Sequence, residues 1–172
     1  MIYNPTKLTA QQSLKVIFAF FALLVVSSFY IEYVLEVPPC KMCWWQRYTH
    51  WMITGFALFS LIMKDEDIKR RGLIVTLVVA LLSLGIGAYQ SLGQLGWMEL
   101  PQSCQGGAAA SFDNLADPAD LMAELQSIKE MEPSCGDTSF TIFGLTLAGW
   151  NAIMMTAVSS IIAVWLRTNR KK

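Results

Sequence analysis

Two cysteines separated by two residues, Cys40 and Cys43, form a C-x-x-C motif, and Arg47 follows one helical turn later. Residues three apart share a helix face, so these thiols could form a disulfide. The N-terminus of a helix lowers a thiol pKa, and an arginine on the same face would favour the Cys43 thiolate. The pattern therefore predicts a reactive thiol pair capable of disulfide exchange.

Two further cysteines, Cys104 and Cys135, stand well apart in the sequence. All four could bind zinc, but structural zinc sites usually use paired C-x-x-C motifs, and we predict no metal site. Two structural disulfides are another alternative, although they would not explain why Arg47 enters an apolar helix, where a charge is costly. Arg47 could also simply extend to the lipid headgroups.

The composition indicates which elements carry these residues. Of the 172 residues, 54% are hydrophobic and 15% are charged, against about 25% charged in typical soluble domains. The net charge of zero gives no electrostatic case for binding nucleic acid. Long apolar runs predict one all-α membrane domain over 1–172, a four-transmembrane-helix bundle, because a soluble fold would have too little polar sequence to cover them. The predicted spans are about 14–35, 44–63, 72–93 and 142–166.

The distribution of Lys and Arg predicts how these spans are oriented. Most of them lie in the two terminal tails and in the connection between the second and third spans. Positive residues concentrate on the cytoplasmic side, so we predict a multi-pass membrane protein with both termini in the cytoplasm. All four cysteines then lie in periplasmic loops, about 36–43 and 94–141, in a compartment that permits disulfides.

The second periplasmic loop contains a helix signal. Asp117 can cap a helix and Pro118 can begin it. Leu121, Leu125 and Ile128 then recur on one face. We predict a short amphipathic helix that lies on the membrane surface or packs on the loop itself. The loop is acidic, which would suit a soluble protein partner better than anionic lipid.

Redox cysteines outside the membrane need a terminal electron acceptor. The sequence has no flavin, nucleotide or haem fingerprint, so a lipid-soluble quinone, ubiquinone or menaquinone, is the acceptor available. Arg47 could hydrogen-bond a quinone oxygen and stabilise charge that develops there. Four aromatic residues could form an interfacial belt or line the pocket of such a ring: Trp44, Trp45, Tyr48 and Trp51.

Other residues within the spans have simpler interpretations. His50 is the only histidine, so a triad or multi-histidine metal site is excluded, and it could line a polar pocket. Gly85 and Gly87 resemble the start of a dinucleotide fingerprint but lie within a predicted span. We interpret these glycines as positions of close helix packing.

The order of these features resembles the DsbB family of bacterial inner-membrane thiol–quinone oxidoreductases, which implies a location in the bacterial inner membrane. The resemblance covers nearly the whole chain, with four spans, two loop cysteines and a second span that opens with Pro39-Cys40-Lys41-Met42-Cys43-Trp44-Trp45-Gln46-Arg47. It implies that all four cysteines are catalytic. Cys40 and Cys43 would be the quinone-coupled pair, with Cys43 facing the quinone and Arg47 supporting it. Cys104 and Cys135 would exchange with a DsbA-like periplasmic thiol oxidase, and Cys104 would form the mixed disulfide.

The family pattern is not matched everywhere. Several relatives have a Tyr-His pair late in the third span, where this chain has Tyr89 and Gln90.

The competing class is a structural four-span membrane protein with disulfide-stapled outer loops, of tetraspanin or claudin type. Those proteins carry adjacent cysteines followed by glycine, and this sequence has no such pair. A reductase that moves electrons outward would favour cysteines inside the spans.

Overall fold

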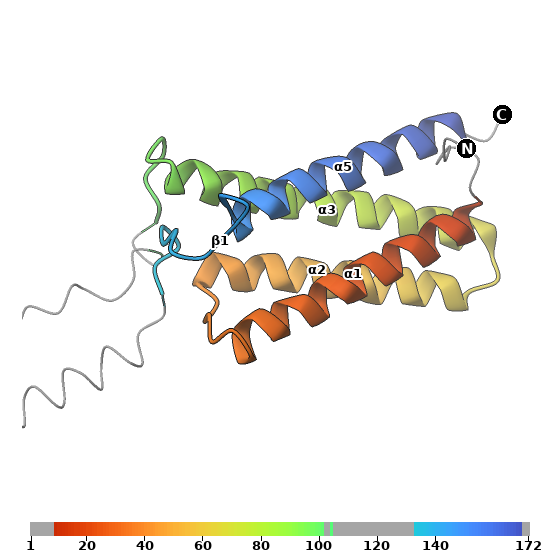
Figure 1. The fold of residues 1–172 in the computed structure, drawn as a ribbon. Coiled ribbons are helices and arrows are strands. Elements are labelled where there is room, and N and C mark those ends of the chain that lie inside the picture. The colour runs from red at the N-terminus through yellow and green to blue at the C-terminus, as the bar shows by residue number, and fades with distance from the viewer. Residues whose placement is uncertain (1–8, 102–103, 105–132, 170–172) are drawn as a thin grey trace, which may run out of the picture.

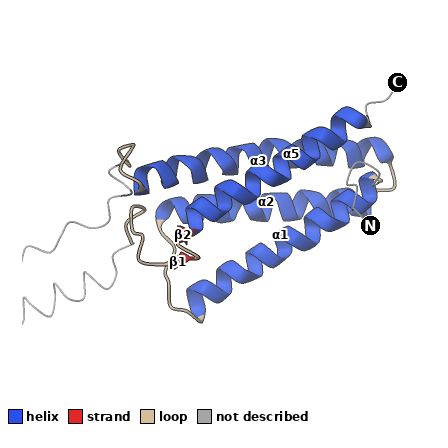
Figure 2. Ribbon diagram, turned by 45° about the horizontal axis from the view of Figure 1, so that its top comes forward, coloured by secondary structure: helices blue, strands red, loops and turns tan. Residues whose placement is uncertain are grey.

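The computed structural model describes residues 9–101, 104 and 133–169 (Figure 1). Within these ranges four long helices lie side by side in an elongated bundle. They are α1 (Ala10–Tyr33), α2 (Lys41–Ile62), α3 (Glu66–Gln94) and α5 (Leu147–Thr168). Two short strands, β1 (Thr141–Ile142) and β2 (Leu145–Thr146), pair antiparallel before α5 (Figure 2). This hairpin differs from the predicted all-α fold, which contains no strands.

Helices α1, α3 and α5 are long and apolar enough to cross a bilayer. Helix α2 has a similar length of 22 residues, but Gln46, Arg47 and His50 in its first half reduce its hydropathy. The chain is therefore a mostly helical, multi-pass membrane protein. The membrane crossing of α2, the fourth predicted span, stays a prediction.

Side-chain caps set where the helices begin. Thr9, Asp65 and Thr146 accept backbone N–H groups at the starts of α1, α3 and α5. Helix α2 is capped by sulfur, because Cys40 Sγ accepts the backbone N–H of Cys43 at 3.2 Å. Oxygen-bearing side chains normally occupy this position. The cap places the first cysteine of the C-x-x-C motif directly on the N-terminus of a helix.

The structure differs from the expected element boundaries around the hairpin. Helix α5 begins at Leu147, whereas the predicted span begins near 142. Phe143 and Gly144 have φ angles of 52° and 76°, and they turn the chain between β1 and β2. Positive φ at two successive turn residues suits the twist of a tight hairpin. The predicted amphipathic helix after Pro118 lies outside the described residues.

The helices pack mainly through three interfaces, α3 with α5, α2 with α3, and α1 with α2. At Gly87 of α3, an added Cβ would lie 2.8 Å from Asn151 Nδ2 of α5, so this glycine permits close packing. An added Cβ at Gly85 would have no atom within 4 Å, and the same interpretation is wrong there. Helices α1 and α5 make few contacts, and cavities open between them.

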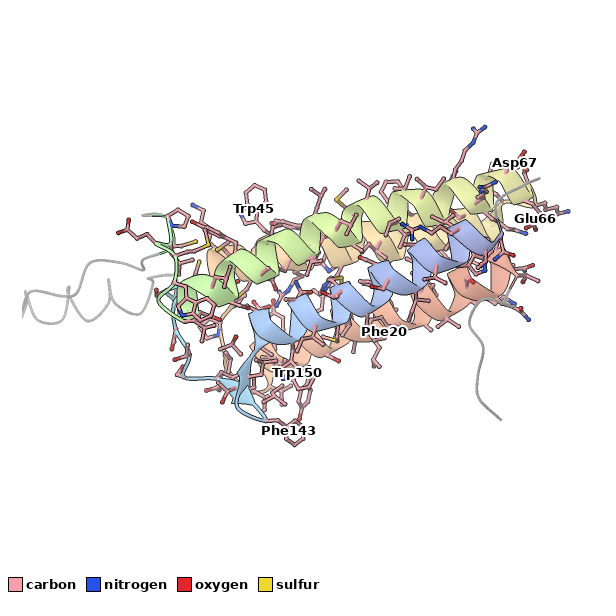
Figure 3. The ribbon with its side chains drawn as sticks, turned by 90° about the horizontal axis from the view of Figure 1, so that it is seen from above. Phe20, Trp45, Glu66, Asp67, Phe143 and Trp150 are labelled. Atoms are coloured by element: carbon pink, nitrogen blue, oxygen red, sulfur yellow. The ribbon has the colours of Figure 1, made fainter. Side chains whose placement is uncertain are left out.

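The two ends of the bundle carry different residues. The start of α1, the α2–α3 connection and the end of α5 lie at one end, where Glu66 and Asp67 are found (Figures 1 and 3). The start of α2, the end of α3 and the hairpin lie at the opposite end, near Phe143 and Trp150. The residues predicted to react therefore belong to one end of the molecule.

Candidate functional site

The four cysteines meet at the end of the bundle where α2 begins. Cys40, Cys104 and Cys135 are buried and pack together, and Cys43 lies against them. All four are thiols in the structure. Hydrogen bonds join Cys104 to Cys135, Cys135 to Cys40, and Cys40 to Cys43. The sulfur atoms therefore form a continuous line from the loop pair to the helix pair.

The described loop segment is held against the helices by its backbone. The Cys135 N–H donates to the carbonyl of Cys104 at 2.8 Å, which brings together two residues distant in sequence. The Ser134 hydroxyl donates to the same carbonyl at 3.1 Å. Gln94 of α3 donates from Nε2 to the Cys135 carbonyl at 3.0 Å. These bonds fix Cys135 next to the start of α2.

Gln90 of α3 connects the two cysteine pairs. Its Nε2 donates to Cys40 Sγ at 3.3 Å and to the Cys135 carbonyl at 3.1 Å. Its Oε1 accepts from Gln46 Nε2 at 2.9 Å, and the side chain is 2% exposed. In the sequence, Gln90 stands out only as a departure from a family pattern. The signal that could have identified it is a polar side chain late in an apolar run, where burial requires partners.

The electrostatics of the pair differ from the sequence-based expectation. The Cys43 thiol donates a hydrogen bond to Cys40 Sγ. Further hydrogen bonds reach Cys40 from the Cys43 N–H, from Cys135 and from Gln90. Together they lower the pKa of Cys40 to about 6, against the opposing effect of burial. The helix N-terminus thus favours a thiolate at Cys40, which is the capping residue. The expected Cys43 thiolate is not found, because the hydrogen bond to Cys40 and burial raise the pKa of Cys43. Burial, and secondarily Cys104, raises the pKa of Cys135.

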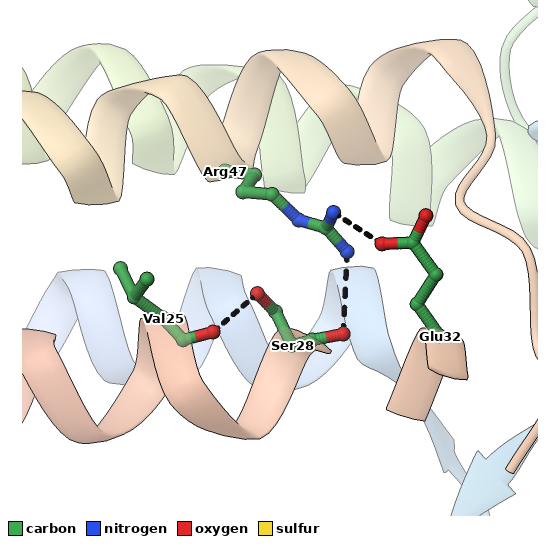
Figure 4. Close-up of polar contacts among 4 residues, drawn as sticks. All are labelled: Val25, Ser28, Glu32 and Arg47. Atoms are coloured by element: carbon green, nitrogen blue, oxygen red, sulfur yellow. Dashed lines mark hydrogen bonds and ion pairs between the residues drawn. The ribbon is translucent and has the colours of Figure 1, made fainter. Parts of the chain in front are cut away.

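Arg47 is buried between α1 and α2 (Figure 4). Its guanidinium forms an ion pair with Glu32 and donates to the Ser28 carbonyl at 3.2 Å. It also lies 4.6 Å from the ring centroid of Trp44 and 5.0 Å from that of Phe29. Glu32 was not predicted as the partner of Arg47, although a carboxylate in an apolar run indicates that a charged partner is needed.

The aromatic residues near the start of α2 lie mainly outside the cavity described below. Trp44 packs on Arg47, and Trp45 points away from the bundle (Figure 3). Trp45, Tyr48 and Trp51 are exposed. None of the four residues singled out from the sequence is among the described residues that line the cavity. Their positions match an interfacial belt better than a ring-binding pocket.

A cavity of about 470 Å³ lies between α1, α2, α5 and the outer segments. Cys40, Cys43 and Arg47 line it, together with His50. Most of its remaining surface is apolar, contributed by residues such as Leu24, Ile31, Leu147 and Met154. A flat ring with two carbonyl oxygens fits this chemistry, because the walls are apolar and a few polar groups could orient it. The residues present therefore suit a quinone.

A helical membrane bundle with four thiols aligned at one end, beside an apolar cavity, defines a class of membrane proteins suited to disulfide chemistry. The match to a known family is more specific. The family model described as Disulfide bond formation protein DsbB matches residues 10–166. The chain therefore belongs to the DsbB family.

Individual relatives carry the same name. The chain is 27% identical over 158 residues to Disulfide bond formation protein B of Azoarcus sp. (strain BH72), covering 90% of each chain. It is 28% identical over 161 residues to the protein of that name from Saccharophagus degradans, covering 93% of this chain and 95% of the relative. No solved structure matches the chain.

Proposed function

We propose that this protein is a thiol–quinone oxidoreductase that reoxidises a periplasmic DsbA-like thiol oxidase and passes the electrons to membrane quinone. The observation that carries the proposal is the line of sulfur atoms from Cys104 through Cys135 and Cys40 to Cys43, which ends at the cavity. Membership of a family of disulfide bond formation proteins supports it.

Disulfide exchange can follow the line of sulfur atoms. The reduced partner attacks a Cys104–Cys135 disulfide through a mixed disulfide at Cys104, and its second thiol resolves that bond, leaving both loop cysteines reduced. The Cys135 thiolate then attacks Cys40 Sγ. The Cys40–Cys43 bond breaks and Cys43 leaves as a thiolate. Cys104 next attacks Cys135, which restores the loop disulfide and releases Cys40, so two electrons reside on the helix pair.

The lowered pKa of Cys40 supports electron flow in this direction. A thiol of low pKa leaves readily, and a stabilised thiolate favours the reduced form of its pair. Cys40 has a lowered pKa, whereas burial raises that of Cys135. The loop pair therefore favours its disulfide form, and the helix pair favours its reduced, dithiol form. Hydrogen bonds from Cys43 N–H and Gln90 hold the charge on Cys40.

The helix pair faces the cavity in which the quinone substrate would be reduced. Quinone supplies an acceptor for two electrons and two protons. Cys43 and Arg47 line the same cavity, and the guanidinium offers charged donors to an oxygen on which negative charge develops. Glu32 and the Ser28 carbonyl hold the guanidinium in one orientation.

The proposed topology is one four-span domain over 1–172 in the inner membrane, with both termini in the cytoplasm and the cysteines in periplasmic loops of about 36–43 and 94–141. Helix α2 is a suitable fourth span, because its polar residues are satisfied inside the protein. Gln46 and Arg47 are buried and hydrogen-bonded, and His50 lines the cavity. The grouping of the cysteines at one end of the bundle, opposite the α2–α3 connection, supports this orientation.

Steady-state quinone reduction by the purified protein tests the proposal. Wild-type protein should reduce decylubiquinone or a short-chain menaquinone in the presence of a reduced DsbA-like protein, and comparison of the two identifies the preferred quinone. Cys43→Ser should abolish quinone reduction. Cys104→Ser or Cys135→Ser should block exchange with the partner protein, while a small dithiol still supports quinone reduction.

Two outcomes would contradict the proposal. Normal turnover of a small dithiol by Cys43→Ser would remove that residue from the quinone step. Absence of quinone reduction by the wild type, with no visible absorbance band on adding quinone, would leave a structural membrane protein with disulfide-stapled loops. Ser60→Ala, a buried substitution remote from the cavity lining, is a suitable control.

A further inference from the structure

A polar network crosses three helices beside the cavity, and disulfide exchange makes no use of it. His50 of α2 lines the cavity, and its Nε2 lies 3.0 Å from Asn151 Oδ1 of α5. Asn151 Nδ2 donates to the backbone carbonyl and to the hydroxyl of Ser83 in α3, both at 3.3 Å. Asn151 is buried, whereas His50 is half-buried against the cavity.

This network fixes which ring nitrogen of His50 carries the proton. The Ser83 carbonyl can only accept, so the NH₂ group of Asn151 must face it, and Oδ1 must face the ring. Oδ1 in turn needs a donor, so Nε2 carries a hydrogen. In a neutral imidazole the other nitrogen, Nδ1, then has a free lone pair. Among the described residues, no hydrogen-bond partner of Nδ1 appears.

The packing of α3 against α5 leaves room for the side-chain amide of Asn151. An added Cβ at Gly87 would lie 2.8 Å from Asn151 Nδ2 and 3.2 Å from the Ala148 carbonyl. A side chain at this position would therefore displace the amide that orients the histidine. The backbone of α3 thus supports the position of His50 indirectly, through Asn151.

His50 and Arg47 are placed to act on one ring. They are three residues apart on α2, so they lie on one helix face with Cβ atoms about 5–6 Å apart. Both line the cavity. A spacing of this size is comparable to that between carbonyl oxygens on opposite sides of a six-membered ring. The cavity lining also includes Asp137 and Ser139, which are exposed, so water can reach it from the outer segments.

We propose that His50 is a proton-transferring residue of this site: the free lone pair of Nδ1 takes a proton from water in the cavity, and the resulting Nδ1–H donates that proton to a carbonyl oxygen of the quinone substrate. The inference rests on the proposed function and assigns a role within it. The step balances. Closing the Cys40–Cys43 disulfide releases two electrons, the quinone takes up two electrons and two protons, and His50 recovers its proton from water.

The need for such a residue follows from the proton content of the reduced pair. A Cys40 thiol with a pKa of about 6 is mainly thiolate at neutral pH. The reduced pair therefore brings one proton, on Cys43, with its two electrons. The second proton must come from water, and the imidazole is a side chain suited to moving it near neutral pH.

Nitrogen NMR can test the inference directly, because the chain has a single histidine. Protein labelled with ¹⁵N-histidine and purified without a histidine tag should give one protonated ring nitrogen and one unprotonated ring nitrogen. Adding decylubiquinone to saturation, verified by quenching of protein fluorescence, should shift the unprotonated Nδ1 signal. Asn151→Leu should remove the tautomer preference. An unchanged histidine spectrum at saturating quinone would overturn the proposal.

Steady-state kinetics distinguish a role of His50 in proton transfer from a role in the shape of the cavity. His50→Gln retains polar groups but cannot exchange a proton in the same way, so kcat for quinone should fall by about a hundredfold, with a smaller change in KM. His50→Phe should lower kcat and also raise KM. Thr49→Val alters a buried neighbour that does not line the cavity, and it should keep wild-type values.

The two hypotheses fail in different ways. If wild-type protein neither binds nor reduces quinone, the proposed function is wrong. If the wild type reduces quinone but His50→Gln has the wild-type kcat, only the role of His50 is wrong. A folding defect in His50→Phe would not affect the decision, because the NMR titration uses wild-type protein.

Discussion

The amide of Gln90 donates to Cys40 Sγ at 3.3 Å, and this bond joins α3 to the first cysteine of α2. The same nitrogen donates to the Cys135 carbonyl at 3.1 Å. One helix side chain therefore contacts both cysteine pairs. Because Gln46 holds its other end, Gln90 has little freedom to leave this position. The alignment of the two pairs thus depends on α3 as well as on the loop.

Gln90→Leu should slow electron transfer from the loop pair to the helix pair. A hydrogen bond to a charged group contributes about 1.5–3 kcal/mol, so a decrease of about tenfold or more in turnover with the protein dithiol is expected. The KM for quinone should change little. Gln94→Leu is the matched control, because Gln94 contacts the Cys135 carbonyl without a bond to Cys40. Equal effects of the two substitutions would show that only loop anchoring matters.

Cys40 should be the reactive thiol of the reduced protein. Its iodoacetamide alkylation rate should reach half its maximum near pH 6, while buried Cys135 reacts slowly. Because the pKa of Cys40 is lowered by folding, the thiolate stabilises the fold above the ordinary thiol pKa. This contribution is lost as the pH falls through about 6. Mass spectrometry of alkylated peptides measures the midpoint. A midpoint near the unperturbed value of about 8.5 would contradict the geometry of the cap.

Arg47→Lys should keep the fold but raise the KM for quinone, because an ammonium does not reproduce the planar donor fork. A loss of about 1–2 kcal/mol, or about five- to thirtyfold, is expected. Arg47→Met should impair turnover further and destabilise the protein, since Glu32 would be left without its partner. Steady-state kinetics and thermal melting measure the two effects.

Adding Glu32→Gln to Arg47→Met separates stability from function. The double variant has no uncompensated charge, so it should regain much of the melting temperature while its quinone KM stays high. Wild-type kinetics for Arg47→Lys and Arg47→Met alike would leave the arginine as a helix anchor only.

Gly87→Ala should destabilise the bundle, because its Cβ would lie 2.8 Å from Asn151 Nδ2 and within 3.4 Å of two backbone atoms of α5. Overpacking of this kind costs about 1–3 kcal/mol. Gly85→Ala, two residues earlier on the same helix, should be tolerated, since its Cβ meets no atom within 4 Å. Thermal melting in one detergent compares them. Equal melting temperatures for the two variants would argue against the close α3–α5 approach.

All four cysteines should react from the periplasm after reduction. An impermeant maleimide applied to intact spheroplasts, with a denaturant step to expose buried thiols in a parallel lysed sample, distinguishes the two sides. Lys64→Cys, in the α2–α3 connection, supplies the cytoplasmic control and should be labelled only after lysis. Labelling of Lys64→Cys from outside would reverse the proposed topology.

Much of this protein follows from the sequence alone. Apolar runs predict long helices, because a membrane-spanning backbone must satisfy its own hydrogen bonds. The C-x-x-C spacing predicts a thiol pair at the start of a helix, since three-residue spacing and helix termini are local properties. Family resemblance adds the roles expected of Cys104 and Cys135. These inferences depend on residues close together in the chain or on a pattern that spans all of it.

The tertiary structure determines which side chains from different helices contact one another. The ion pair of Arg47 with Glu32, the contact of Gln90 with Cys40 and the bond of His50 to Asn151 each join different helices. Such pairs depend on the rotation and depth of one helix against another, and sequence periodicity leaves both undetermined. The helix N-terminus also acts on Cys40 rather than Cys43, because the cap is set by the backbone where the chain enters α2.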